Sequence, residues 1–297
     1  MAEITRRRTG ELLRKLFEIL KEFPEGLPAR VALERLVNSV KLTEWEAGFY
    51  EDGSRRLEKI VRFGTVDCVK AGWLAKQKGT WTLTEAGLEA YQKLPDPEAF
   101  YKEAVRLYTV WKKGRPPDIV EPKPEDGGDD VTKVTSITFE QAEEQAWAEI
   151  AAYVAALDPY EFQYLVADLL KAMGYFPSWV APPGKDGGVD IIAYLDPLGT
   201  RLPRIKVQVK RQQQRISRDG LSAFLAHVNQ EDVGLFVNIA GFTRDAEDFA
   251  RSQERRKITL IDLERLVDLW VEASPKLDDV ARGRLPLRPI YFLTPTR

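Results

Sequence analysis

The sequence has 297 residues, a length that favours about two domains, and its 44% of hydrophobic residues is enough to form ordinary globular cores. The single cysteine, Cys68, excludes a disulfide framework or a cysteine-rich zinc site within one chain. No apolar run approaches the roughly 18 residues of a membrane span, and the Arg-rich N-terminus lacks the apolar core of a signal peptide. We therefore expect a cytoplasmic protein with no membrane association.

The net charge of −2 is distributed unevenly along the chain. Residues 1–113 hold 21 basic and 17 acidic side chains, whereas residues 114–156 hold 3 and 10. The remaining residues, 157–297, are close to balance with 20 and 19. Because the acidic excess lies in the middle, both ends of the chain stay compatible with binding DNA.

The N-terminal section is predicted to be mainly helical. Apolar residues at helical spacing predict helices over 9–23 and 31–40, and a third helix begins after Ser54. Residues 73–83 predict a short β-hairpin with a basic tip, and Thr84 can cap the helix that follows. Three helices followed by a hairpin is the order of a winged helix-turn-helix, so we predict a winged-helix DNA-binding domain.

Basic side chains on the third helix and on the hairpin of this domain, residues 1–113, are candidates for contacting DNA. Those on the helix recur on the side opposite its apolar stripe, and those on the hairpin lie near its tip. A merely solvated surface is the alternative, but a presumed recognition helix and wing favour DNA contact. The predicted DNA-binding residues are Arg55, Arg56, Lys59, Arg62, Lys76 and Lys78.

The middle of the chain is predicted to be a spacer. Residues 114–137 are rich in Pro, Gly and Asp, which is typical of a flexible acidic linker. Residues 139–157 then have the spacing of an amphipathic helix that leads into the C-terminal domain, residues 138–297. From residue 158 on, the predicted order of helices and strands is α-β-β-β-α-β-α-β-α, which indicates an α/β domain with a mixed sheet flanked by helices.

Two strands of the C-terminal domain carry the clearest candidate site. A glycine-rich turn leads into an apolar strand at Asp190, and residues 204–210 alternate strictly between polar and apolar. The turn between the two strands is centred on Gly199. A hairpin with that register places Asp190 opposite Gln208, with Lys210 one step along the same face. One carboxylate, one amide and one ammonium group are then expected to converge.

This Asp…Gln-x-Lys pattern, with its neighbours, resembles the active-site pattern of the Mrr-like branch of the PD-(D/E)xK nucleases. The resemblance covers residues 158–273, and residues 56–91 resemble the N-terminal module that accompanies this nuclease domain. The segments that carry the nuclease resemblance are Asp158-Pro159-Tyr160-Glu161-Phe162, Gly174-Tyr175, Asp186-Gly187-Gly188-Val189-Asp190-Ile191, Val207-Gln208-Val209-Lys210-Arg211 and Gly241-Phe242-Thr243.

The resemblance implies a restriction-endonuclease-like fold and a metal-dependent DNA endonuclease that restricts foreign or modified (methylated) DNA. It implies that Mg²⁺ or Mn²⁺ is held by the carboxylate of Asp190, the amide oxygen of Gln208 and the backbone carbonyl of Val209. Lys210 is expected to orient the attacking water and to stabilise developing negative charge. The opening helix of the family usually carries Glu where this sequence has Gln163, which can either hydrogen-bond a metal-bound water or serve helix packing.

Two other functions stay open at this point. One is a structure-selective DNA repair or junction nuclease built on the same core. The other is a non-catalytic DNA-binding regulator with a retired nuclease domain, which the Gln163 departure motivates. The single histidine, His227, argues against histidine-based nucleases, serine triads and histidine zinc sites. Double-stranded DNA is the expected partner, and a homodimer or a higher homo-oligomer is left open.

Overall fold

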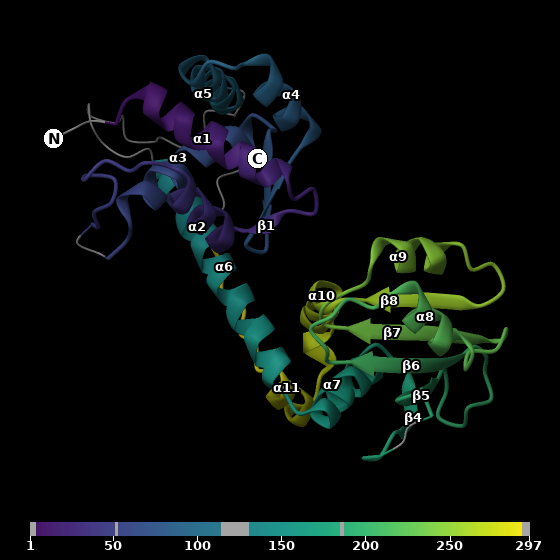
Figure 1. Ribbon diagram of the computed structural model, residues 1–297. Coiled ribbons are helices and arrows are strands. Elements are labelled where there is room, and N and C mark those ends of the chain that lie inside the picture. The colour runs from purple at the N-terminus through teal and green to yellow at the C-terminus, as the bar shows by residue number, and fades with distance from the viewer. Residues whose placement is uncertain (1–3, 51–52, 114–130, 185–186, 293–297) are drawn as a thin grey trace. The chain divides into compact units, whose positions relative to one another are not determined.

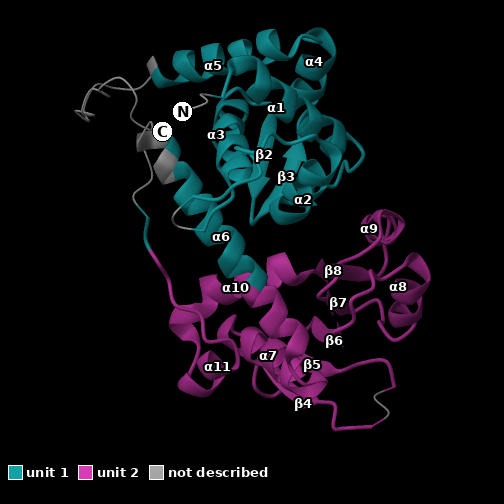
Figure 2. Ribbon diagram, turned by 60° about the vertical axis from the view of Figure 1, so that its left-hand side comes forward, with its two compact units in different colours: residues 1–148, 291–297 teal, residues 149–290 magenta. Residues whose placement is uncertain are grey.

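The computed structural model of the chain describes residues 4–50, 53–113, 131–184 and 187–292 (Figure 1). Most of the predicted linker and Asp186 of the glycine-rich turn lie outside these ranges. Within them, no helix is both long and apolar enough to cross a membrane. The chain divides into two compact units, residues 1–148 with 291–297 (unit 1) and residues 149–290 (unit 2), which Figure 2 distinguishes by colour.

Unit 1 combines helices with a three-stranded antiparallel sheet of order β1-β3-β2. The predicted hairpin is present, and its two-residue turn, Lys78-Gly79, has positive φ at both positions, as type I′ turns require. Three helices precede this hairpin, in the order expected from the sequence. The elements are α1 (Arg6–Lys21), β1 (Leu27–Pro28), α2 (Ala29–Ser39), α3 (Arg56–Lys70), β2 (Leu74–Gln77), β3 (Thr80–Leu83), α4 (Glu85–Lys93) and α5 (Pro97–Lys113).

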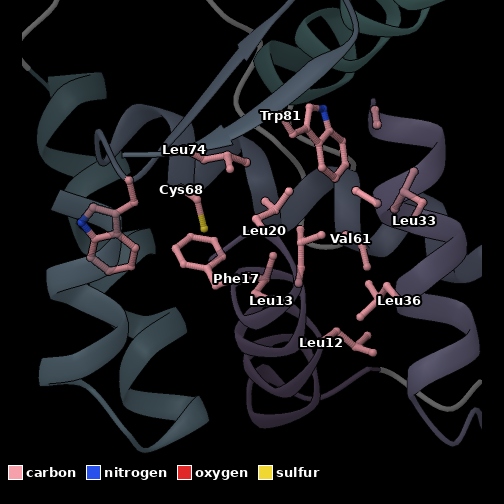
Figure 3. Packing of buried hydrophobic residues seen from close by; sticks show 14 of the residues in the cluster. Leu12, Leu13, Phe17, Leu20, Leu33, Leu36, Val61, Cys68, Leu74 and Trp81 are labelled. Carbon is pink, nitrogen blue, oxygen red and sulfur yellow. The ribbon is translucent and has the colours of Figure 1, made fainter. Parts of the chain in front are cut away.

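The core of unit 1 forms around α1 (Figure 3). Leucines and Phe17 of α1 recur at helical spacing and are fully buried against α2, α3 and β3. Phe17 also meets Phe100 of α5 edge to face, with ring centroids 5.1 Å apart. Trp81 of β3 is fully buried in the same cluster, so the hairpin is anchored to the helices by its apolar face.

A long helix, α6 (Val131–Ala156), runs across the predicted boundary between the linker and the C-terminal domain. It starts inside the predicted linker, 114–137, and the expected helix 139–157 is thus present with an earlier start. No Gly or Pro occurs within α6, so nothing in its sequence breaks the helix. Residues 138–148, predicted as the start of the nuclease domain, lie in unit 1.

Unit 2 is built on a five-stranded sheet of order β4-β5-β6-β7-β8. The first three strands pair antiparallel, whereas β6, β7 and β8 pair parallel, so the sheet is mixed. The chain order from α7 to α10 is the predicted α-β-β-β-α-β-α-β-α. The elements are α7 (Pro159–Ala172), β4 (Phe176–Val180), β5 (Ile191–Tyr194), β6 (Arg204–Lys210), α8 (Arg218–Leu225), β7 (Asp232–Asn238), α9 (Arg244–Arg251), β8 (Lys257–Ile261), α10 (Leu263–Ala273), the 3-10 helix η1 (Ser274–Lys276) and α11 (Asp279–Arg284).

Helices cover both faces of this sheet (Figure 1). Phe236 of β7 packs against α8 and α9, while its neighbours Leu235 and Val237 face α7 and α10. This alternation along β7 is the period of two that a strand with both faces covered requires. The predicted α/β domain with a mixed sheet flanked by helices is confirmed.

Candidate active site

The first turn of α7 places two polar side chains at the ends of β5 and β6. Asp158 caps the helix by accepting a hydrogen bond from the backbone N–H of Tyr160 (2.8 Å), and Pro159 occupies the first helical position. Tyr160 and Gln163 are three residues apart and therefore share one side of the helix. Both line a pocket of about 280 Å³.

Asp190 lies directly before β5 and is buried at the edge of this pocket. Its Oδ1 accepts a hydrogen bond from Gln163 Nε2 (3.2 Å), and its Oδ2 accepts one from the backbone N–H of Val209 (2.6 Å). Ile191 pairs with Val207, so the register of the predicted hairpin is confirmed. That register, set around Gly199, brings Asp190 beside the end of β6.

Val209, Lys210 and Asp190 line the same pocket, but Gln208 is not among its lining residues. Gln208 is half-buried on β6, in register with Phe236 of β7. The register nevertheless continues to Asp190 opposite Gln208, as predicted, and the role of Gln208 as a metal ligand stays a prediction. Gln163 of α7 is in hydrogen-bond contact with Asp190.

Three further residues of the pocket were missed by sequence reasoning. The hydroxyl of Tyr160 accepts a hydrogen bond from the backbone N–H of Gly184 (3.2 Å). The guanidinium of Arg211 donates to the backbone carbonyl of Ala155, and Gln212 follows it along the rim. Their spacing could have indicated them, because Tyr160 lies one helical turn before Gln163 and Arg211 directly follows Lys210.

A second buried carboxylate, Asp232, lies at the opposite end of β6 and has a different environment. It accepts hydrogen bonds from Arg204 Nε (3.0 Å) and lies 3.1 Å from Lys206 Nζ. Burial on its own raises the pKa of Asp232, but the bonds from Arg204 and Lys206 outweigh burial and lower it. This carboxylate is paired with cations inside the sheet and lines no part of the pocket.

Comparisons with known proteins identify the family. The Mrr catalytic-domain family, described as a restriction endonuclease, matches residues 154–270. The chain is also 30% identical over 278 residues to the Type IV methyl-directed restriction enzyme EcoKMrr of Escherichia coli (strain K12), covering 84% of this chain and 86% of that one. This chain belongs to the Mrr family of restriction endonucleases. A solved structure of the MspJI restriction endonuclease in complex with a 27-mer oligonucleotide aligns with 69% of this chain and 47% of its own, at 17% identity and a TM-score of 0.33.

The pocket of this Mrr-family protein lies within the segment that matches the catalytic domain. The resemblance drawn from Asp190 and Lys210 is thereby confirmed at the level of the family, and the protein is a DNA endonuclease by membership. The roles of individual side chains in the pocket stay predictions.

Two of the predicted DNA-binding residues do not lie on an open face. Arg62 of α3 is buried, and its guanidinium donates to Glu140 Oε1 (2.7 Å) and to Glu144 Oε2 (2.8 Å) of α6. Lys76 of β2 donates to Glu140 Oε2 (2.6 Å). The indole N–H of Trp81 completes the set by donating to Glu140 Oε1 (3.0 Å). α6 therefore covers Arg62 and Lys76, and their predicted contact with DNA stays a prediction.

The other four predicted residues of the Mrr-family protein each lie beside an aromatic or acidic neighbour. Arg55 is half exposed, with its Nε 3.9 Å from Glu58. The remaining three cations lie over aromatic rings, at 4.8 to 5.4 Å from the ring centroid. These pairs are Arg56 with Trp45, Lys59 with Tyr50, and Lys78 with Trp147.

Proposed function

We propose that this protein is a Mg²⁺- or Mn²⁺-dependent endonuclease of Type IV character that cuts methylated double-stranded DNA. The observation that carries the metal-dependent site is the pairing of Asp190 with Gln163. Gln163 Oε1 is buried and has no hydrogen-bond partner among the described residues. A buried acceptor without a donor costs free energy, so it marks a place for a ligand. The methylated substrate is inferred from the relative that is named methyl-directed.

The oxygen atoms of the pocket fit a hard divalent cation. The carboxylate of Asp190, the amide oxygen of Gln163 and the backbone carbonyl of Val209 are the ligand types that Mg²⁺ prefers. Gln208 stays a predicted fourth ligand from the same strand. The described residues contain no cluster of three acidic, His or Cys side chains that could hold a metal. With one carboxylate in the pocket lining, we expect affinity for the cation to be weak until DNA phosphate adds its oxygens.

A bound cation would supply positive charge at the scissile phosphate and make a water molecule more acidic. The protein's own groups then hold the reactants in place. Lys210 would donate hydrogen bonds to the attacking water and stabilise negative charge that develops on the phosphate. Arg211 lines the same pocket and has a buried Nε without a partner among the described residues, so it would orient a phosphate oxygen.

The recognition of DNA is assigned to unit 1 in this proposal. The order of three helices and a hairpin is that of a winged helix-turn-helix, with α3 as recognition helix and β2–β3 as wing. The half-exposed Arg55 at the start of α3 is positioned to contact phosphates.

A cleavage assay tests the proposal. Purified protein is incubated with methylated, unmethylated and branched DNA of the same sequence, with Mg²⁺, with Mn²⁺ or with a chelator. We expect cutting of the methylated duplex only when a divalent cation is present. Preference for branched DNA would favour the repair or junction nuclease, and DNA binding without cutting under every condition would favour the retired nuclease domain. Calorimetric titration of Mg²⁺ into wild type and Asp190→Ala tests the metal site independently of activity.

A further inference from the structure

A buried cluster of ion pairs joins α6 to the proposed DNA-reading elements of unit 1. Glu140 and Glu144 lie one helical turn apart on α6 and therefore project from the same side of the helix. Together they accept hydrogen bonds from Arg62 of α3, Lys76 of β2 and the indole of Trp81. One acidic stripe of α6 thus contacts both the recognition helix and the wing.

The chemistry of this stripe is that of a DNA backbone. Two carboxylates, about 5–6 Å apart at their Cβ atoms, offer anionic oxygens to a guanidinium and an ammonium group, as two phosphates would. The tip of the hairpin is covered as well, since Lys78 lies over the ring of Trp147, 5.4 Å from its centroid. Arg62, Lys76 and Lys78 are therefore occupied by residues of the same chain.

The contact is held mainly by ion pairs, one of which has the opposite sense and joins Lys133 of α6 to the buried Asp67 of α3 (2.6 Å). The apolar cluster that α6 joins is small, with Ile137 packed against Val66 and Tyr108. Arg62 Nε is buried and has no partner among the described residues, so pairing with α6 leaves one guanidinium donor unused. A purely structural contact is as well served by apolar side chains as by buried ion pairs. Cations that pair with carboxylates can instead pair with the phosphates of a duplex, because each carboxylate and each phosphate diester carries one negative charge.

We propose that α6 competes with DNA for the face of α3 and β2–β3 that carries Arg62 and Lys76. In this proposal α6 covers that face until a duplex displaces it. The proposal rests on the assignment of DNA reading to unit 1. Its consequence is that the affinity of the full chain for DNA is lower than that of the exposed cationic face, by the free energy needed to release α6.

A disulfide trap tests the proposal directly in the full chain. A Cβ atom at Gly79 would lie 3.3 Å from the Cβ of Glu144, close to the 3.5–4.5 Å that disulfides span. Gly79→Cys with Glu144→Cys should therefore form a bond that locks α6 onto the wing. Burial raises the pKa of the native Cys68 thiol, so Cys68 should not interfere. The strain of Cys at the positive φ of Gly79 is common to both redox states.

Affinity for a methylated duplex is measured by fluorescence anisotropy on this variant, oxidised and reduced. We expect the oxidised form to bind at least about tenfold more weakly, since the cations of α3 and the wing stay occupied. Wild type treated with the same oxidant and reductant should show no difference. Equal affinity of the two forms would overturn the proposal.

Charge removal on α6 gives the opposite effect. Glu140→Gln with Glu144→Gln keeps acceptor oxygens but weakens the hold on Arg62 and Lys76, so affinity for the duplex should rise by about tenfold. The exposed Glu149→Gln, on the same helix, changes the charge at a position away from the stripe and should leave affinity unchanged. An affinity that stays at the wild-type value in the double variant, with a wild-type melting curve, would contradict the proposal.

Arg55→Glu separates this proposal from the assignment on which it rests. Arg55 is half exposed and lies 3.9 Å from Glu58 of its own helix, so it is available to DNA whether or not α6 is displaced. If Arg55→Glu leaves affinity unchanged, unit 1 is not the reader and the proposed function fails in that part. If Arg55→Glu weakens binding while the oxidised trap does not, only the competition by α6 is wrong.

Discussion

Two buried polar networks of this protein invite comparison, one around Asp190 in unit 2 and one around Glu140 in unit 1. At Asp190, a carboxylate accepts hydrogen bonds from two amide N–H groups, and the amide oxygen of Gln163 is left without a partner. At Glu140, a carboxylate meets two cations and an indole, and the Nε of Arg62 is left without a partner.

The difference lies in which kind of atom is unsatisfied. An acceptor without a donor beside a carboxylate is completed by a cation, whereas a guanidinium donor without an acceptor is completed by an anion. The network around Asp190 is therefore suited to bind a metal, and the network around Glu140 is suited to yield its cations to phosphate. The variants below test this contrast, beginning with the largest expected effect.

Removing the carboxylate of the first network should abolish cleavage. Asp190→Ala and Lys210→Ala are each expected to lower the single-turnover rate by about a thousandfold or more, as loss of a charge-stabilising group does in other active sites. DNA affinity should stay within a few-fold of wild type, because phosphate contacts carry most of it. Plasmid cleavage and anisotropy are measured on the same preparations. Cutting at the wild-type rate by either variant removes the site assignment.

Removing the carboxylate of the second network should instead destabilise the fold. Glu140→Ala leaves Arg62 and Lys76 buried without their partner, which is expected to cost about 3–5 kcal/mol of unfolding free energy. Chemical denaturation of the full chain, followed by Trp fluorescence, gives the loss. Gln141→Ala, the exposed neighbour on α6, is the matched control and should change stability by less than about 0.5 kcal/mol. Stability of Glu140→Ala equal to that of the control would show that α6 is not held by this pair.

Adding a carboxylate to the first network should strengthen metal binding. Gln163→Glu places a second charge beside Asp190, so unit 2 should be less stable without metal and gain more from Mg²⁺. We expect Mg²⁺ affinity to rise by about tenfold, equivalent to ~1.4 kcal/mol. Calorimetric titration and the melting temperature with and without Mg²⁺ measure this.

The matched variant is Gln208→Glu on β6. Gln208 is predicted as a ligand but does not line the pocket, so its effect on Mg²⁺ affinity should be smaller than that of Gln163→Glu. A larger effect at Gln208 would show that the side chain of Gln208, and not that of Gln163, completes the metal site.

Local patterns made much of unit 2 predictable. Strict alternation over residues 204–210 and the turn at Gly199 fixed both the strands and their register, because a slip by one residue would turn every buried side chain outward. The position of Asp190 beside the end of β6 followed from that register. Contacts between the helices and the sheet could not be predicted in this way, since no periodicity shows that Gln163 of α7 reaches Asp190.

In unit 1, local patterns likewise predict the elements but not the contacts between them. The helices and the hairpin follow from periodicity, and α5 carried an unused signal in the apolar spacing of Phe100, Ala104 and Tyr108. The spacing of Arg62 predicts an exposed position, because the face opposite the apolar stripe of a helix is usually solvated. What covers it is Glu140, 78 residues further along the chain. Pairing across such a separation is decided by tertiary packing, and one sequence holds no local sign of it.

A further effect, which depends on pH, is expected at Asp232, a carboxylate paired with two cations in the sheet of unit 2. Arg204 and Lys206 lower its pKa in spite of burial, so the folded state releases the proton more readily than the unfolded state. Its contribution to stability is therefore present above the unfolded pKa of about 3.9 and is lost as the pH falls through the lower folded value. Because Arg204 is about a third exposed, we expect Asp232→Asn to cost only about 1–2 kcal/mol at pH 7.

Thermal melts of Asp232→Asn and wild type at pH 7 and pH 3 check this expectation. The difference in melting temperature should be present at pH 7 and should shrink at pH 3, which lies below the unfolded pKa of an aspartate, about 3.9. Asp279→Asn is the matched control, since Asp279 is almost fully exposed beside Arg282 and should change the melting temperature little at either pH. An equal loss of melting temperature at both pH values would mean that Asp232 stabilises unit 2 through the shape of its side chain. The charge of Asp232 would then contribute little to its pairing with Arg204 and Lys206.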